Sequence, residues 1–114
     1  MPNNERRGRC LCGAVRFVAR GEPIWVAHCH CESRRRATSA AFATYAGYAA
    51  AAIEWSGGAR AIHRSSPGVQ RGFCPRCGSP LSFESARWPG EVHLLQPSFA
   101  DPESLTPPGT AETS

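Results

Sequence analysis

The sequence has no lysine, no long apolar run and no internal repeat. All thirteen basic residues are arginine. A stretch of about 18 or more apolar residues, which a membrane-spanning helix requires, is missing. The opening residues MPNNERRGRC lack the apolar core of a secretory signal, so we expect a cytoplasmic protein with no membrane partner. No long segment has the 3.6-residue apolar period of a helix, which argues against a helical bundle.

The charge balance is only weakly basic. The formal net charge is +4 at pH 7. The sequence also has six cysteines, and four of them bound as thiolates to one Zn²⁺ would contribute about −2 and leave a net charge of roughly +2. The charge therefore gives little support for nucleic acid as a partner. The interleaved basic and aromatic residues of a single-strand binder are also missing. A nucleic-acid-binding zinc module is thus the least favoured of three functional classes; the other two, considered below, are an enzyme and a non-catalytic binding protein.

The length of 114 residues is typical of a single domain. Residues 1–7 are polar, and we expect them to form a disordered N-terminus. Residues 102–114 are rich in proline, serine and threonine, and we expect a flexible C-terminal tail there. Residues 8–101 are expected to form one zinc-binding β domain. A chain of this size buries only about 65% of its unfolded surface, so a bound metal would add useful stability.

Short strand patterns between turn residues predict a mainly β fold with one or two helical turns. Turn markers such as Gly57-Gly58 and Ser66-Pro67-Gly68 separate the strands. The helical turns are expected directly after Cys31 and over Ala49–Ile53. The predicted strands are Ala14–Ala19, Ile24–His28, Phe42–Tyr48, Ala61–Arg64, Val69–Phe73, Leu81–Phe83 and Val92–Gln96.

Six cysteines occur as three closely spaced pairs. Because the cytoplasm keeps thiols reduced, metal binding is the leading explanation for them. Three disulfide bonds would be the alternative in an exported protein. The pairs lie in the segments CLCG, CHC and CPRCG and are Cys10/Cys12, Cys29/Cys31 and Cys74/Cys77.

The CPRCG segment is the most specific of these motifs. Two thiolates three residues apart can bind one tetrahedral ion, and the following glycine lets backbone N–H groups point at sulfur. A closed structural site needs four ligands, and either C-x-C pair could supply two from one face of a strand. CLCG shares the following glycine, so we assign one structural Zn²⁺ to Cys10, Cys12, Cys74 and Cys77. The alternative is that these are buried free cysteines that act as small apolar residues.

The segments GRCLCGAVRF, HCHCESRRRAT, SSPGVQRGFCPRCGSPLSF and DPESL occur in this order over residues 8–105. Together they resemble the glutathione-dependent formaldehyde-activating enzyme family, which includes centromere protein V. The resemblance implies an Mss4-like fold, in which small stacked antiparallel sheets are stapled by zinc. It also implies that the first C-x-C pair and the late C-x-x-C pair bind the structural ion.

The resemblance further implies a second, catalytic zinc on the three cysteines of a C-H-C-x-x-C-R-R motif. Cys29 and Cys31 match the first two cysteines, but the third falls on Arg34; Arg35 and Arg36 match the basic pair. A zinc ion with three cysteine ligands and one open position could bind and deprotonate a substrate thiol. A guanidinium at about 6 Å would instead repel the ion by on the order of 5 kcal/mol. We therefore expect this second zinc site to be weak or empty.

Other side chains near the pair are poor substitutes for the missing thiolate. His30 should point to the opposite face of the strand, Glu32 could ligate only if the chain turns, and the Ser33 hydroxyl is a weak ligand. His28 is a further candidate. A lone strand histidine is more often structural than a ligand, and His93 is interpreted in this way, as is His63.

The resemblance implies a zinc-dependent carbon–sulfur lyase that forms or cleaves a thiol–aldehyde adduct of the S-hydroxymethylglutathione type. Its partners would be a small-molecule thiol such as glutathione and a small aldehyde. Arg35 and Arg36 could hold the carboxylates of the substrate, although exposed arginines are as often solvated surface. The alternative is a non-catalytic, zinc-stapled binding protein that kept the fold, because one cysteine of the catalytic motif is missing.

Overall fold

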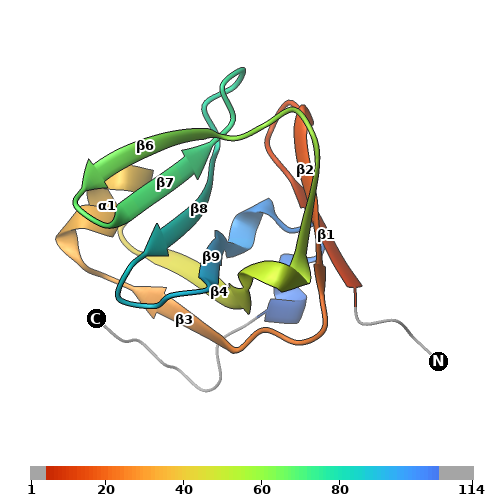
Figure 1. Ribbon diagram of the computed structural model, residues 1–114, viewed down its shortest axis with the longest axis horizontal. Helices are drawn as coiled ribbons and strands as arrows, with labels where there is room; N and C mark the ends of the chain where they lie inside the picture. Colours follow the sequence, from red (N-terminus) through yellow and green to blue (C-terminus); the bar gives the residue numbers. More distant parts are fainter. Residues whose placement is uncertain (1–4, 106–114) are drawn as a thin grey trace.

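The structure is a computed structural model that describes residues 5–105, and it contains two antiparallel sheets (Figure 1). The smaller sheet has the strand order β1 (Glu5–Arg9), β2 (Val15–Arg20), β5 (Ile53–Gly57). The larger sheet has the order β3 (Trp25–Cys29), β4 (Ala43–Ala49), β9 (Glu91–Leu95), β8 (Pro80–Ser85), β7 (Val69–Phe73), β6 (Ala61–Ser66). The predicted mainly β fold is confirmed.

Helical segments are short and connect the strands. The helical turn predicted after Cys31 is α1 (Glu32–Thr38), and the turn predicted near residue 50 is the 3-10 helix η1 (Ala50–Ala52). Two further 3-10 helices, η2 (Gln96–Ser98) and η3 (Pro102–Leu105), follow β9. Among residues 5–105, no helix has the length and apolar character needed to cross a bilayer.

The main hydrophobic core lies between the two sheets. Phe17 of β2 packs edge-on against Phe99, with ring centroids 5.1 Å apart, and contacts Trp55 of β5 at 5.4 Å. The larger sheet contributes the apolar side chains of one of its faces. The core includes Val15, Phe17, Ala19, Ala46, Tyr48, Ile53, Leu81, Val92, Leu94, Phe99 and Leu105. This packing uses one face of the larger sheet and leaves the other free to form a site.

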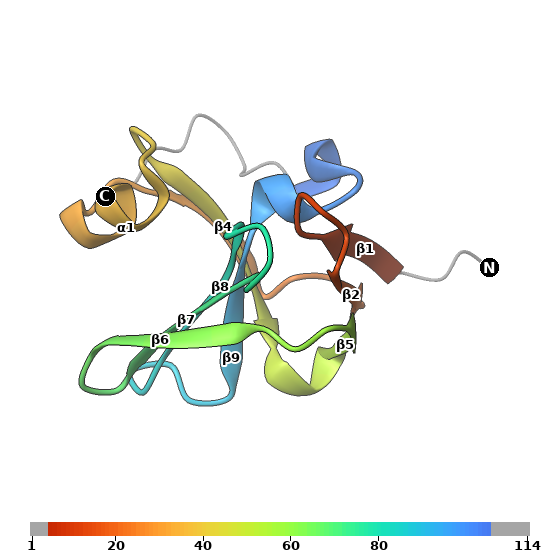
Figure 2. The ribbon, with the colours of Figure 1, turned by 90° about the horizontal axis from the view of Figure 1, so that it is seen from above.

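The opposite face of the larger sheet carries a second, smaller cluster, in which Ala43, Tyr45, Phe83 and Leu95 are buried. Strand pairing aligns its members, because Tyr45 lies opposite Leu95 in β4 and β9. The sheet is bent, so that β3–β4 and β6–β7 diverge away from the smaller sheet, and α1 lies near the open end (Figure 2). The second face is therefore concave and bordered by α1.

The structure differs from the sequence-based expectation in two strands that were not predicted, β1 and β5. The other strands occur where they were predicted, with ends shifted by a few residues. β1 has the polar sequence ERRGR, whose local pattern does not indicate a strand. It forms because it pairs with β2, where Gly8 lies opposite Phe17. A Cβ atom on Gly8 would lie 2.2 Å from the Phe17 ring, so only glycine fits there.

Ordered structure also extends beyond the limits expected at both ends of the domain. β1 begins at Glu5, inside the segment expected to be disordered. The helix η3 occupies the start of the expected tail, and its Leu105 is only 1% exposed. The rest of both predicted terminal segments, residues 1–4 and 106–114, lies outside the described part of the chain.

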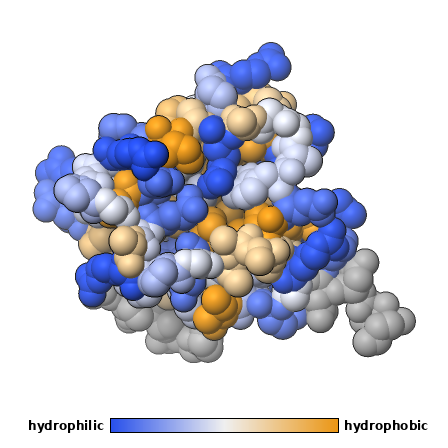
Figure 3. Space-filling view, viewed as in Figure 1, coloured by the Kyte–Doolittle hydropathy of each residue, from blue (hydrophilic) through white to orange (hydrophobic). Residues whose placement is uncertain are grey.

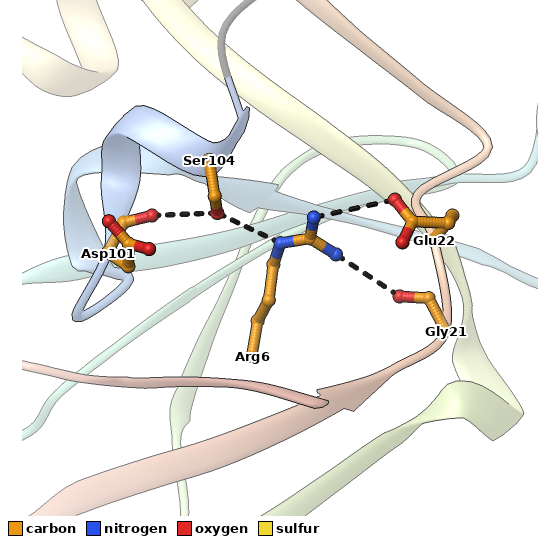
Figure 4. Close-up of polar contacts among 5 residues, drawn as sticks. All are labelled: Arg6, Gly21, Glu22, Asp101 and Ser104. Atoms are coloured by element: carbon orange, nitrogen blue, oxygen red, sulfur yellow. Dashed lines mark hydrogen bonds and ion pairs between the residues drawn. The ribbon is translucent and has the colours of Figure 1, made fainter. Parts of the chain in front are cut away.

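Arg6 of β1 links these two ends (Figure 4). Its Nε donates a hydrogen bond to the Ser104 hydroxyl at 2.9 Å, and Ser104 in turn donates to the Asp101 carbonyl. The guanidinium also donates to the Gly21 carbonyl and contacts the Glu22 carboxylate, both at 3.4 Å. These contacts explain why polar terminal segments are ordered without a strong local signal.

Candidate metal centre and candidate active site

Four cysteines from two distant parts of the sequence meet in space. Cys10 and Cys12 lie in the β1–β2 turn, and Cys74 and Cys77 lie in the β7–β8 loop; Figure 1 and Figure 2 both show these loops adjacent. The four sulfurs lie within 4.8 Å of one another. The Cys10–Cys12 and Cys12–Cys74 sulfur distances are 3.7 and 3.8 Å. Tetrahedral zinc with bonds of about 2.3 Å separates its sulfurs by about 3.8 Å, so the cluster fits this ion.

Both cysteine turns have the same local geometry. Gly13 and Gly78 follow the second cysteine of each pair and adopt φ values of 82° and 81°. This left-handed conformation reverses the chain tightly. Backbone N–H groups are thereby directed at sulfur: Val15 donates to Cys10 at 3.4 Å, and Arg76 donates to Cys74 at 3.3 Å. Such donors stabilise thiolates, which are the form that binds metal.

The electrostatics of the four-cysteine cluster favour a cation. A hydrogen bond from the Ser79 hydroxyl, with further help from backbone N–H groups, lowers the pKa of Cys77 to about 5. The Ala14 N–H acts to lower the pKa of Cys12, but burial and the neighbouring cysteines outweigh it and raise that pKa to about 11. Thiolates that have already formed in the cluster, such as Cys77, thus oppose ionisation of the remaining thiol of Cys12. A divalent cation would remove this conflict, because coordination deprotonates thiols outright.

The second C-x-C pair has a different partner. Cys29 ends β3, and Cys31 precedes the first residue of α1. Their sulfurs are 3.5 Å apart. The Arg34 Nη1 group donates a hydrogen bond to Cys29 Sγ at 3.1 Å and lies 3.8 Å from Cys31 Sγ. The guanidinium therefore contacts both sulfurs.

Aromatic rings hold the Arg34 side chain in this position. Its guanidinium carbon lies 4.1 Å from the Phe83 ring centroid and 5.1 Å from that of Tyr45. Burial acts against the charged form, but the hydrogen bond and charge of Cys29 outweigh it, so the pKa of Arg34 rises above its already high ordinary value. Arg34 is thus a permanent, partly buried cation. Two sulfurs beside a fixed cation do not fit a catalytic zinc.

None of the substitute ligands considered from the sequence completes the second site. The Ser33 hydroxyl lies 3.5 Å from Cys31 Sγ, whereas Glu32 pairs with Arg36 on the surface of α1 at 2.9 Å. His30 packs against Phe42, and His28 Nδ1 lies 2.6 Å from the Thr44 hydroxyl. Arg35 is exposed and donates to the His30 carbonyl at 3.1 Å. Arg35 and Arg36, predicted to bind substrate, thus lie on the surface of α1.

A cavity of about 270 Å³ opens beside Cys29 and Arg34. In the space-filling view, apolar side chains show between hydrophilic ones on the surface (Figure 3). Two nitrogen atoms of the lining residues, Arg34 Nε and His93 Nδ1, are buried and have no hydrogen-bond partner in the described part of the chain. The cavity is lined mainly by Trp25, Cys29, Arg34, Tyr45, Trp88 and His93. It combines aromatic walls, thiols, a cation and an unpaired imidazole nitrogen.

His93 is held in one orientation by Glu91 and Trp25. Its Nε2 lies 3.0 Å from the Glu91 carboxylate, and the Trp25 ring meets it edge-on with centroids 4.5 Å apart. Burial is the main cause that lowers the pKa of His93, so the ring is neutral near pH 7. The contact with Glu91 assigns the proton to Nε2 and leaves Nδ1 as an acceptor.

Sequence reasoning interpreted His93 as a structural strand residue and missed its place in this cavity. The residues around it come from separate strands: Gly47 of β4 and Phe83 of β8 lie opposite it. A Cβ atom on Gly47 would lie 2.4 Å from the Trp25 ring, so this glycine lets Trp25 lie against the sheet. Only the strand order brings these residues together.

Comparisons with known proteins agree with this architecture. The profile of a family described as glutathione-dependent formaldehyde-activating enzyme matches residues 5–112. A Halomonas elongata protein named "Putative glutathione-dependent formaldehyde-activating enzyme" is 35% identical over 118 aligned residues, which cover 89% of this chain and 69% of that protein. A crystal structure of a Rhodobacter sphaeroides protein superposes with a TM-score of 0.70 at 19% identity, covering 94% of this chain and 99% of the other. The last comparison supports the fold alone.

Proposed function

The chain belongs to the glutathione-dependent formaldehyde-activating enzyme family, and from this membership we propose that it forms or cleaves the carbon–sulfur bond of a thiol–formaldehyde adduct of the S-hydroxymethylglutathione type. The observation that carries the proposal is the cavity that holds the Arg34 cation and neutral His93 together. The proposed partners are a small thiol such as glutathione and a small aldehyde. The family resemblance and the reduced cysteines suit a cytoplasmic site of action.

The cleavage reaction needs two groups. When the hydroxyl group of R–S–CH₂–OH loses its proton, the carbon–sulfur bond breaks and releases formaldehyde and the thiolate R–S⁻. His93 Nδ1, which lacks a partner in the described chain, would accept the hydroxyl proton. The Arg34 guanidinium would stabilise the departing thiolate, as it now contacts Cys29. In the direction of synthesis, the Arg34 guanidinium would stabilise the attacking thiolate, and His93 would return the proton to the oxygen of the adduct.

A larger groove next to the cavity has room for the rest of a peptide thiol. Its volume is about 730 Å³, and His28 lines both the groove and the cavity. Phe42 and Leu95 supply apolar walls, and Arg9 lies at the rim. In this proposal Arg35 and Arg36 of α1 hold the carboxylates of the substrate by paired hydrogen bonds.

Zinc has a structural role in this proposal. Cys10, Cys12, Cys74 and Cys77 would bind one ion and use all four of its positions, which leaves none for a substrate. The ion would fix the β1–β2 turn to the β7–β8 loop. The residues at Cys29 do not fit a second ion, so no catalytic step is assigned to one.

The test measures how fast glutathione and formaldehyde exchange with their adduct at equilibrium, by magnetisation-transfer NMR. We expect the wild-type protein to accelerate exchange, and we expect His93→Gln and Arg34→Met to lower that acceleration at least about tenfold. Arg64→Met, an exposed arginine of β6, is the matched control. No acceleration by the zinc-loaded wild type would refute the lyase, and adduct binding without acceleration would favour a non-catalytic binding protein.

A further inference from the structure

We propose that Cys29 and Cys31, together with the Arg34 guanidinium, form a metal-free dithiol that undergoes thiol–disulfide exchange with low-molecular-weight disulfides. In the resemblance drawn from the sequence, Arg34 matches the position of the third cysteine of the family's zinc motif. The exchange requires neither formaldehyde nor the proposed lyase activity.

The two sulfurs are close enough to bond to each other. They lie 3.5 Å apart, and a disulfide bond of about 2.05 Å requires them to approach by about 1.5 Å. Cys29 is the last residue of β3, and Cys31 has extended backbone angles just before α1. Because Cys31 lies outside both elements, rotation of its side chain leaves the β3 ladder and the α1 hydrogen bonds intact.

The guanidinium would balance thiolate charge at these sulfurs, which is the role a metal ion would have at the four-cysteine cluster. It contacts both sulfurs, at 3.1 and 3.8 Å, and stacks on Phe83. Unlike a metal ion, it forms no coordinate bond and leaves the sulfur lone pairs free to attack. A nearby cation that does not coordinate is the setting in which cysteine thiolates are reactive.

Cys31 is the better placed of the two to attack. Its side chain is partly exposed, and its sulfur accepts a hydrogen bond from the Cys29 thiol and lies beside the Ser33 hydroxyl. Burial acts to raise its pKa, but Ser33, the Arg34 backbone N–H, Cys29 and the Arg34 charge together lower that pKa to about 7. A thiol with a pKa near the ambient pH is the fastest attacking group in disulfide exchange.

The exchange occurs in two balanced steps. The Cys31 thiolate attacks a small disulfide R–S–S–R, forms a mixed disulfide with one R–S group and releases the other as R–S⁻. The Cys29 thiol then transfers its proton to R–S⁻ and attacks the Cys31 sulfur, which closes the Cys29–Cys31 disulfide and releases the second R–S⁻. The protein dithiol is oxidised by two electrons, and the small disulfide is reduced to one thiol R–SH and one thiolate R–S⁻, which takes a proton from water according to its pKa.

The test treats zinc-loaded, reduced protein with oxidised glutathione and follows it by intact and peptide mass spectrometry. We expect loss of two hydrogen atoms, mapped to a Cys29–Cys31 disulfide, while the zinc on the other four cysteines is retained. Cys29→Ser should stop the reaction at a single glutathione adduct on Cys31. Arg34→Met should slow the first step about tenfold, and Arg34→Lys should slow it less, because the lysine keeps the charge.

Arg64→Met is the matched control and should react at the wild-type rate, because Arg64 is exposed on β6. Circular dichroism and zinc content identify any variant that has not folded. If an Arg34 variant does not fold, the reactions of the wild-type and Cys29→Ser proteins decide whether the exchange occurs. Oxidation that maps first to Cys10, Cys12, Cys74 or Cys77 overturns the proposal. So does a second zinc ion on the native chain that must be chelated before Cys29 and Cys31 react.

Discussion

Two C-x-C pairs in one chain, Cys10/Cys12 and Cys29/Cys31, have opposite surroundings. The first meets Cys74 and Cys77, so that four sulfurs face a common point. The second meets the guanidinium of Arg34, so that two sulfurs face a fixed positive charge. The spacing within each pair is the same. What each pair can bind is decided by the side chains that the rest of the fold brings to it.

The two pairs show how neighbouring side chains change the chemistry of a pair of thiols. In the four-cysteine cluster the pKa of Cys77 is lowered to about 5 while that of Cys12 is raised to about 11, so ionisation of all four thiols would need an external cation. The pair with Arg34 has its cation built in. The first arrangement is expected to be inert once it binds a metal ion, and the second, whose sulfurs are partly exposed, is expected to be reactive.

The largest effect is expected from Cys74→Ser, which removes one ligand of the four-cysteine cluster. Cys74 is fully buried. Loss of the ion should remove on the order of 10 kcal/mol of binding free energy, which is comparable with the whole stability of a small domain. We expect a protein without zinc that is largely unfolded, as measured by mass spectrometry of metals and circular dichroism. Cys31→Ser is the control and should keep both zinc and fold.

Arg34→Cys would make the Cys29/Cys31 pair resemble the four-cysteine cluster, because both would then consist of thiols alone. Removing the cation and adding a thiolate should create a three-cysteine site, so the zinc content should rise from one ion to two per chain. The new ion should be the more easily removed by a chelator, because its site has an open position. An unchanged zinc content would show that residue 34 does not occupy the place of the third cysteine.

A smaller effect is expected at His93, whose buried ring is neutral. Its pKa is lowered in the folded state, so the unfolded chain binds more protons below the ordinary histidine pKa of about 6.5. The free energy of unfolding should therefore fall as the pH drops below about 6.5. Urea titrations at several pH values should show a shallower fall in His93→Gln. Equal slopes would show that the pKa of His93 is the same in the folded and unfolded states.

The smallest effect is expected from Arg36→Ala on the exposed side of α1. Arg36 and Glu32 form an i,i+4 pair in which both side chains are mostly exposed. Such pairs contribute about 0.3–0.5 kcal/mol, so thermal unfolding should shift only slightly. The same measurement on Arg34→Ala should give a clearly larger shift, because Arg34 stacks on Phe83. Equal shifts would mean that the packing of Arg34 contributes little.

Local patterns in the sequence predicted much of the fold, and they failed where a segment depends on distant partners. β2, whose apolar residues alternate, and β7, which lies between turn residues, were found close to their predicted limits. β1 and η3 were missed because polar residues gain their order from contacts of Arg6 and from burial of Leu105. His93 was taken as structural because most residues that line its cavity, such as Trp25, Arg34 and Tyr45, lie far away in the sequence.

The sequence by itself determined the cysteine spacing, the glycine after each of the pairs Cys10/Cys12 and Cys74/Cys77, and the position of Arg34 three residues after Cys31, since these are properties of short segments. Only the tertiary structure decided where the Arg34 charge lies. A long, flexible side chain can turn to solvent or inward, and it lies against Cys29 here because Phe83 and Tyr45, from two other strands, form an aromatic surface for its guanidinium.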